Sequence, residues 1–310
     1  MSKSPISLTA PPAGVDAPFA RSSLSRDGLN VHRLFVTAVL ALFTSALSLS
    51  IRAATASTIK GDILDRIDPA RSGEMIGSAL GVAFLGFAIT LFVTSPLLNR
   101  IGMGRLLNMA ALCFILGPLL VVIAPAVASH RWVFNLVWAG MLVSGVGWGC
   151  TESAINPMTA ALYPDDKTHR MNVLHAWWPA GLIVGGLLGF ALTQLAVYWR
   201  IVMLTPLLPA AAIMFLASGQ RFPVTESAAM GIPTRDMLRE IFRRPSFFVW
   251  FVLMFGTAST ELAPGQWVDL TLTHIVGMRG ILLLVFVSGL MFVMRHFAGP
   301  LAHHRRLPVL

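Results

Sequence analysis

The residues Gly147-Trp-Gly-Cys-Thr-Glu152-Ser-Ala-Ile-Asn156-Pro157 place a carboxylate and an amide on one face of an otherwise apolar helix. Side chains four residues apart are neighbours on a helix surface, so Glu152 and Asn156 are predicted to lie side by side. The surrounding segment, 132–161, is long and apolar enough to cross a bilayer, which takes about 20 residues. Because a charged side chain near the bilayer centre costs about 2.5–3.5 kcal/mol on insertion scales, Glu152 indicates a functional site.

The composition is that of an integral membrane protein. Of the 310 residues, 55% are hydrophobic and 12% are charged, whereas about a quarter of the residues of a soluble domain are charged. The net charge of +9 does not indicate nucleic-acid binding, because the basic residues lie between apolar runs and not on one face. Cys113 and Cys150 both fall in apolar segments, so we expect neither a disulfide framework nor a metal site, and no cofactor.

Eight segments are long and apolar enough to be predicted as membrane-spanning helices. They are 34–55, 75–98, 106–128, 132–161, 171–195, 199–218, 247–268 and 278–298. Residues 1–33 are rich in Pro, Ser and Ala and are predicted to be a disordered cytoplasmic tail, being long for the start of a signal peptide. The predicted fold class is an all-α polytopic membrane protein with a six-helix N-terminal bundle, 34–218, and two helices of a second bundle within 247–310.

The distribution of lysine and arginine predicts that the N-terminus is cytoplasmic. In that orientation the inner segments carry fifteen of these residues and the outer loops seven, with Arg52 counted among the seven. Positive residues are enriched in cytoplasmic loops, so this orientation is favoured over its inverse.

The segment 219–246 is predicted to be a cytoplasmic linker with a short amphipathic helix on the membrane surface. Thr234 is expected to cap this helix and Pro245 to stop it. One face would be apolar and the other basic, with Met237, Leu238, Ile241 and Phe242 on the first and Arg235, Arg239 and Arg243 on the second.

Three features of the sequence carry a family resemblance, and the third consists of two stretches. The loop Asn99-Arg100-Ile-Gly102-Met-Gly104-Arg105 resembles the Gly- and basic-rich signature between helices 2 and 3 of the major facilitator superfamily, with Asn99 in place of the usual acid. The block Gly145–Gly189 and the stretches Thr260–Trp267 and Met294–Gly299 resemble its fucose/glucose/galactose permease-like branch. A weak internal repeat, Ser95–Arg100 against Gly299–His304, fits the two related halves of such a protein.

The resemblance implies a secondary transporter that couples the movement of a sugar, or a similar small polar solute, to protons by alternating access. Glu152 matches the acid that faces the central cavity, and Asn99, Arg100, Gly102 and Arg105 match the loop that gates it. Proton-coupled members also carry an acid on the first helix, where this chain has Ser48-Leu-Ser50-Ile-Arg52 and no acid until Asp62. Facilitated or differently coupled transport therefore remains an alternative, and a bacterial cytoplasmic (inner) membrane is the expected location.

Several other polar and aromatic residues are candidates for binding the solute. Asn156 offers donors and acceptors to hydroxyl groups, or else an interhelical hydrogen bond. His175 and Trp178 open the helix that follows Glu152, and either could pack or line the cavity. On the seventh helix, Glu261, Gln266 and Trp267 are expected to line the opposite wall, or Glu261 to pair with Arg295 of the eighth helix as a structural charge partner.

The chain ends just past the eighth helix, where a twelve-helix transporter would continue. A frameshift or premature stop is the expected explanation, and transport would then be impaired. The rival function is a membrane protein that binds a small ligand without carrying it. An enzyme is not expected, because no catalytic dyad and no zinc-binding motif occur at helical spacing. Neither the substrate nor the oligomeric state follows from the sequence.

Overall fold

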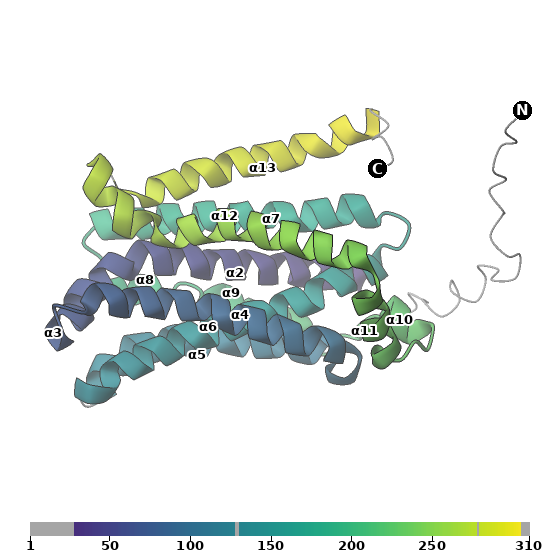
Figure 1. The fold of residues 1–310 in the computed structure, drawn as a ribbon, viewed down its shortest axis with the longest axis horizontal. Helices are drawn as coiled ribbons and strands as arrows, with labels where there is room; N and C mark the ends of the chain where they lie inside the picture. Colours follow the sequence, from purple (N-terminus) through teal and green to yellow (C-terminus); the bar gives the residue numbers. More distant parts are fainter. Residues whose placement is uncertain (1–27, 128–129, 278, 305–310) are drawn as a thin grey trace, which may run out of the picture.

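The computed structural model describes residues 28–127, 130–277 and 279–304, and every regular element in these residues is a helix (Figure 1). Most of the expected tail, residues 1–27, and the basic end, 305–310, lie outside the described residues. The elements in chain order are α2 (Val31–Ile59), the π-helix η1 (Lys60–Leu64), α3 (Asp65–Ile67), α4 (Ser72–Ile101), α5 (Met103–Val127), α6 (His130–Leu162), α7 (Lys167–Gln194), α8 (Trp199–Met203), α9 (Leu207–Ala217), α10 (Glu226–Ala229), α11 (Thr234–Arg243), α12 (Pro245–Val276) and α13 (Ile281–His304).

Seven of these helical segments are long and apolar enough to cross a membrane, which confirms the predicted polytopic class. They coincide with the first seven expected spans, counting α8 and α9 as one. The eighth expected span corresponds to α13, in which Ile281–Arg295 is a shorter apolar helix. The sixth span is not continuous as expected, because the helix ends at Met203 and restarts at Leu207, with Pro206 at the N-cap position of α9.

The long helices lie side by side along the longest axis of the molecule, with α2 at the centre of the bundle (Figure 1). Helix α2 packs against α7, α6, α9 and α12, and it is buried along most of its length. Small residues permit the close approach of other helix pairs. A Cβ atom at Gly145 of α6 would lie 2.0 Å from the carbonyl oxygen of Ala83 in α4, so only glycine fits there.

The two ends of the bundle differ in what covers them. One end, called here the linker end, carries the α4–α5 turn and the short helices α10 and α11 (Figure 1). Gly102 makes the α4–α5 turn with a φ of 88°, a conformation that favours glycine. The opposite end carries α3 and α8.

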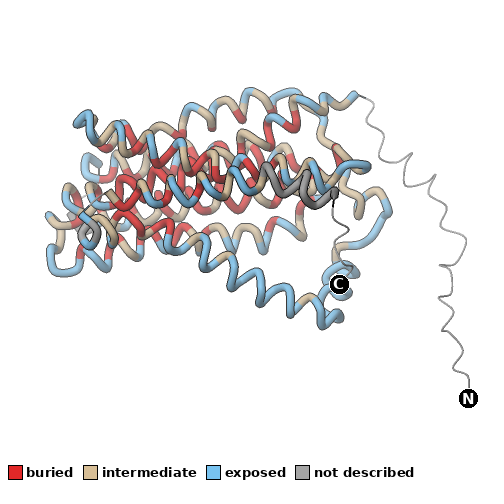
Figure 2. The backbone as a smooth tube through the Cα atoms, turned by 90° about the horizontal axis from the view of Figure 1, so that it is seen from above, coloured by how far each residue is buried: buried red, intermediate tan, exposed pale blue. Residues whose placement is uncertain are grey.

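Helices α12 and α13 join the bundle over only part of their surfaces. Helix α12 packs on α2, and α13 packs on α7. From Pro245 to Pro264 nearly all of α12 is exposed, and burial begins at Gly265 (Figure 2). The part of α12 that contacts the bundle is therefore its second half.

Two expectations about individual residues are wrong. Thr234 does not cap α11, because the N-cap position is Pro233 and the Thr234 hydroxyl donates to the carbonyl oxygen of Pro96 at 3.4 Å. Arg52 does not lie in an outer loop. The first helix runs on to Ile59 and beyond, so Arg52 lies within it and is only 2% exposed.

Candidate functional site

Three polar side chains from α6 and α7 form a hydrogen-bonded row inside the bundle. The Asn156 amide nitrogen donates to Glu152 Oε2 at 3.0 Å. The Asn156 amide oxygen lies 2.9 Å from His175 Nε2. Glu152 and Asn156 are neighbours because they are four residues apart on α6, and the short turn before Lys167 brings α7 back beside them. The row joins three of the residues that the sequence singled out.

The hydrogen bonds within the row fix which atoms donate. The amide nitrogen of Asn156 is committed to the carboxylate, so its oxygen faces His175 and can only accept. The proton of His175 must therefore sit on Nε2. Asn156 thus links the carboxylate to the imidazole, and a change at either end alters the hydrogen bonds at the other.

Aromatic rings enclose the row from one side. Trp148 Nε1 donates to Glu152 Oε1 at 3.4 Å. Its ring stacks on Trp178 with centroids 5.1 Å apart and on Phe87 with centroids 4.0 Å apart. Trp178 is 6% exposed, whereas its neighbour Trp177 is 44% exposed. The tryptophan that faces the row is therefore Trp178.

Trp148 and Phe87 are site residues that the sequence analysis missed. Trp148 stands four residues before Glu152, the same spacing that identified Asn156, so the signal was present on α6 itself. Phe87 comes from α4 and has no local signal, because only the packing of α4 on α6 brings it to the tryptophan. The carboxylate of Glu152 has no basic partner within ion-pair distance among the residues that the structure describes.

The expected residues of α12 occupy three different environments. Glu261 is exposed and lines a cavity of about 470 Å³ between α12, α13 and α7. Trp267 also lines this cavity, and its ring packs on α4 so tightly that a Cβ at Gly77 would lie 2.6 Å from it. Gln266 is fully buried, and neither of its amide atoms has a hydrogen-bond partner in the described part of the chain. Within that part of the chain, no hydrogen bond or ion pair connects these three residues to Glu152.

Arg295 lies on α13, which packs on α7, the helix that carries His175. Among the described side chains, Glu261 and Arg295 form no ion pair with each other. The alternative in which Glu261 lines a cavity is therefore the one that the geometry favours.

The expected gating loop contacts the linker. Asn99 accepts from the Thr225 hydroxyl at 2.6 Å and donates to Ser227 at 3.4 Å. Thr225 in turn caps α10 by accepting from the backbone nitrogen of Ala228. Lys167, at the start of α7, pairs with Glu226 of α10. The linker is thus held to the bundle by polar contacts on two sides.

The other loop residues play different parts. Arg100 and Arg105 are exposed, and Gly102 supplies the left-handed backbone of the turn. Phe222 of the linker packs over the turn, where a Cβ at Gly104 would lie 2.5 Å from its ring.

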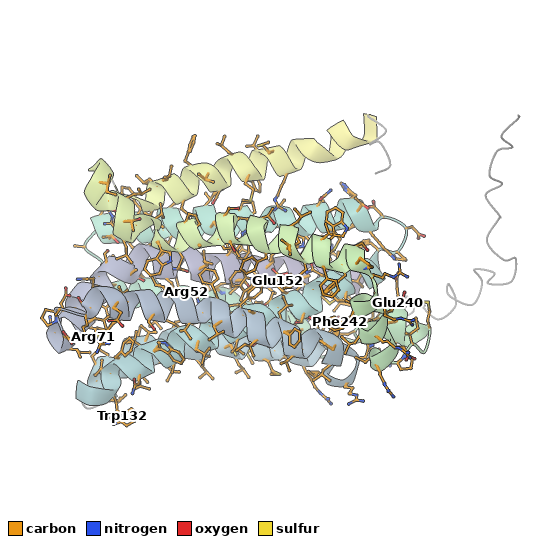
Figure 3. The ribbon with its side chains drawn as sticks, viewed as in Figure 1. Arg52, Arg71, Trp132, Glu152, Glu240 and Phe242 are labelled. Carbon is orange, nitrogen blue, oxygen red and sulfur yellow. The ribbon has the colours of Figure 1, made fainter. Side chains whose placement is uncertain are left out.

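Charged residues near the opposite end of the bundle were not singled out from the sequence. Asp269 of α12 is 2% exposed and pairs with Arg279 at 3.3 Å, and it also accepts from the backbone nitrogen of Ile281 at the start of α13. Arg52 of α2 is equally buried, and its Nε has no hydrogen-bond partner in the part of the chain that the structure covers (Figure 3).

Comparison with known proteins identifies the family to which this helical bundle is similar. The sequence profile of the Major Facilitator Superfamily matches residues 33–310. Curated protein sequences give no match.

Solved structures of similar fold include three of xylose transporters. One is a D-xylose–proton symporter, with a TM-score of 0.67 and 12% sequence identity over 85% of this chain and 67% of that one. Another is the proton:xylose symporter XylE bound to 6-bromo-6-deoxy-D-glucose, with a TM-score of 0.52 and 15% identity over 60% of this chain and 44% of that one. The third is XylE from E. coli in an inward-open conformation, with a TM-score of 0.56 and 13% identity over 74% of this chain and 56% of that one. This chain thus spans between 44% and 67% of the length of these proteins. At such low sequence identities, the structural similarity shows a shared fold and nothing about the substrate. Since the family profile matches almost the whole chain and the helices pack as in solved members, the chain belongs to the Major Facilitator Superfamily.

Proposed function

We propose that this protein is a secondary transporter of a sugar or a similar small polar solute, and that Glu152 carries a proton that is coupled to the solute. The observation that carries the proposal is the row Glu152–Asn156–His175, held beside the Trp148–Trp178 stack in the interior of a membrane bundle. A carboxylate at such a place is costly, and exchangeable acids inside membranes mark ion and substrate pathways. The similar solved structures are described as those of xylose–proton symporters, which supports this choice of solute and ion.

The row offers a way to couple proton and solute. As a carboxylate, Glu152 accepts from Trp148 and Asn156. When it takes a proton, it becomes a donor, and the amide of Asn156 can no longer keep both of its present bonds at full strength. Rotation of the Asn156 amide changes which of its two atoms, the oxygen or the nitrogen, faces His175. A hydroxyl group of a solute bound at Asn156 or His175 would therefore meet a different set of donors and acceptors in the two protonation states.

The aromatic stack supports the row more than it contacts the solute. Both faces of the Trp148 ring are covered, one by Phe87 and the other by Trp178. In this proposal Trp148 holds the carboxylate in place, while Asn156, His175 and Trp178 contact the solute. Glu261 and Trp267 are proposed to form a separate wall, along the cavity between α12 and α13.

The orientation and location belong to the same proposal. We place the linker end in the cytoplasm of a bacterial cell, because the basic residues of the linker and of the α4–α5 turn gather there. The first six spans would move as one unit against the helices that begin with α12, with the Asn99 loop and the linker between them. An enzymatic activity is not part of the proposal.

The test is uptake into proteoliposomes that contain the full 310-residue chain. Radiolabelled D-xylose and D-glucose are supplied with and without an inward proton gradient. We expect the gradient to drive accumulation, and Glu152→Gln to reduce it roughly tenfold or more, the equivalent of about 1.4 kcal/mol. The matched control is Glu74→Gln, which removes an exposed acid that pairs with Arg71 at the opposite end of the bundle.

The outcomes separate the competing functions. Gradient-driven uptake that survives Glu152→Gln would contradict the role of Glu152. Saturable binding of either sugar without uptake above protein-free vesicles would favour the rival function, a ligand-binding membrane protein that does not transport. Uptake that ignores the gradient but is saturable would favour facilitated transport.

A further inference from the structure

The guanidinium group of Arg52 is a buried positive charge without a partner. Its side chain lies within α2, is 2% exposed, and forms no ion pair with any residue that the structure describes. Its Nε atom also lacks a hydrogen-bond partner there. Buried charges in proteins are normally paired, and an intramembrane arginine without a partner indicates a site for an anionic group.

The carboxylates in the same half of the bundle are committed elsewhere. Asp62 accepts from Trp199 Nε1 at 2.7 Å. Asp65 pairs with Lys60 at 2.8 Å, and Asp269 pairs with Arg279 at 3.3 Å. Each of the three acids therefore has a partner of its own, and Arg52 is not the partner of any of them.

Hydroxyl groups of the same helix do not compensate for the charge either. Thr55, one turn after Arg52 on α2, and Ser45, two turns before it, donate to the backbone carbonyls of Ile51 and Ala41. These bonds close within the helix and leave the arginine without a partner.

A second unsatisfied group lies at the same depth in an adjoining helix. Gln266 of α12 is fully buried, and both of its amide atoms lack partners among the described residues. Helices α2 and α12 pack together and run in the same direction from the linker end (Figure 1). At 1.5 Å per residue, Arg52 and Gln266 each lie about 30 Å from the first residue of their helix, Val31 or Pro245.

We propose that Arg52 and Gln266 form a binding site, between α2 and α12, for the carboxylate of a small hydroxylated acid such as a sugar acid. The inference rests on the proposed transport function and makes its substrate class more specific. A guanidinium donates two parallel hydrogen bonds to a carboxylate, and an amide both donates to and accepts from hydroxyl groups. The site lies farther from the linker end than Glu152 (Figure 3). The proton site and the anion site are thus separate.

The test compares two solutes that differ at one carbon, D-glucuronate and D-glucose. Binding to the full chain in detergent is measured by tryptophan fluorescence and by the shift in thermal unfolding, at constant ionic strength. We expect glucuronate to bind about 10-fold to 100-fold more tightly than glucose, because hydrogen bonds to a charged group usually increase affinity by about this factor. Arg52→Gln should abolish this preference, and Arg52→Lys should keep part of it.

Two controls exclude a structural explanation. Arg66→Gln removes an exposed arginine near the same end of the bundle and should leave the preference intact. Without ligand, Arg52→Gln should unfold at the same temperature as the unsubstituted protein or a higher one, because it removes an unpaired buried charge. A much lower unfolding temperature, for both the Gln and Lys variants, would mean that Arg52 is structural and would overturn the inference.

Other results also decide the matter. Equal binding of glucose and glucuronate, or a preference that survives Arg52→Gln, would overturn the anion site. If gradient-driven glucose uptake is then still lost in Glu152→Gln, the proposed function stands without the anion site. If neither solute binds, both the proposed sugar class and the anion site are contradicted.

Discussion

The Glu152 row and the Arg52–Gln266 pair are both buried polar groups in a membrane bundle, but only one of them is satisfied within the chain. In the row, each side chain bonds to another side chain of the row. At Arg52 and Gln266, the polar atoms have no partners in the described residues. A satisfied network keeps its geometry without a ligand, whereas unsatisfied groups gain stability when a ligand binds. The two regions should therefore respond to substitution with opposite signs.

The largest effect is expected from Asn156→Leu. This substitution removes the bridge of the row, so the Glu152 carboxylate keeps only the long hydrogen bond from Trp148 and the His175 imidazole loses its bond to the amide. We expect the free energy of unfolding to fall by about 2–4 kcal/mol, since each stranded group costs about 1–3 kcal/mol. The measurement is unfolding in a denaturing detergent titration. A change below about 1 kcal/mol would show that water replaces the bridge.

Arg52→Met should act in the opposite direction. It replaces an unpaired buried cation with an apolar side chain of similar length, and we expect the free energy of unfolding to rise by about 1–3 kcal/mol. The same titration measures this change, with Arg66→Met as the exposed control. A loss of stability would show that Arg52 has a partner in the folded protein, and the two regions would then not differ in the way described.

The sequence predicted the part of the site that depends on spacing along one helix. Glu152 and Asn156 were identified because residues four apart share a helix face, and the polytopic class followed from the apolar lengths. The bond from Asn156 to His175 also needs the antiparallel packing of α6 and α7. A short connection favours antiparallel packing of two helices, but it does not determine which side chains of the two helices meet.

The residues that were missed are those whose environment is built by distant segments. Arg52 was counted with the loop charges because the first helix was expected to end at residue 55, and it runs on through η1 and α3. Helix α2, which carries it, is enclosed by α7, α6, α9 and α12, and these lie far away in the sequence. Phe87 likewise reaches Trp148 only because glycines such as Gly145 let α4 and α6 approach closely. Hydropathy and spacing do not contain this information.

Trp148→Phe should separate the two roles of the aromatic stack. Phenylalanine keeps a ring between Phe87 and Trp178 but cannot donate to Glu152. The lost hydrogen bond is long, at 3.4 Å, so we expect a destabilisation of only about 1 kcal/mol. The same titration measures it, and Trp132→Phe, at an exposed tryptophan of the same helix, is the control. A loss as large as that of Asn156→Leu would place the tryptophan inside the row.

The smallest effect is expected where the bundle meets the linker, at Asn99. This exposed side chain forms hydrogen bonds with Thr225 and Ser227 of the linker. Asn99→Ala should therefore lower the free energy that favours the bound linker over the detached linker by about 0.5–1 kcal/mol. Limited trypsin cleavage at the linker arginines should then be roughly two- to fivefold faster, because cleavage follows the population of the open form. Asn99→Asp should cleave at the original rate, since a carboxylate can accept from both hydroxyls. Asn172→Ala, at an exposed asparagine of α7, is the control. Faster cleavage in Asn99→Asp would mean that the donated bond to Ser227 is essential. In that case the amide at this position, where the family usually has an acid, is a requirement of this linker.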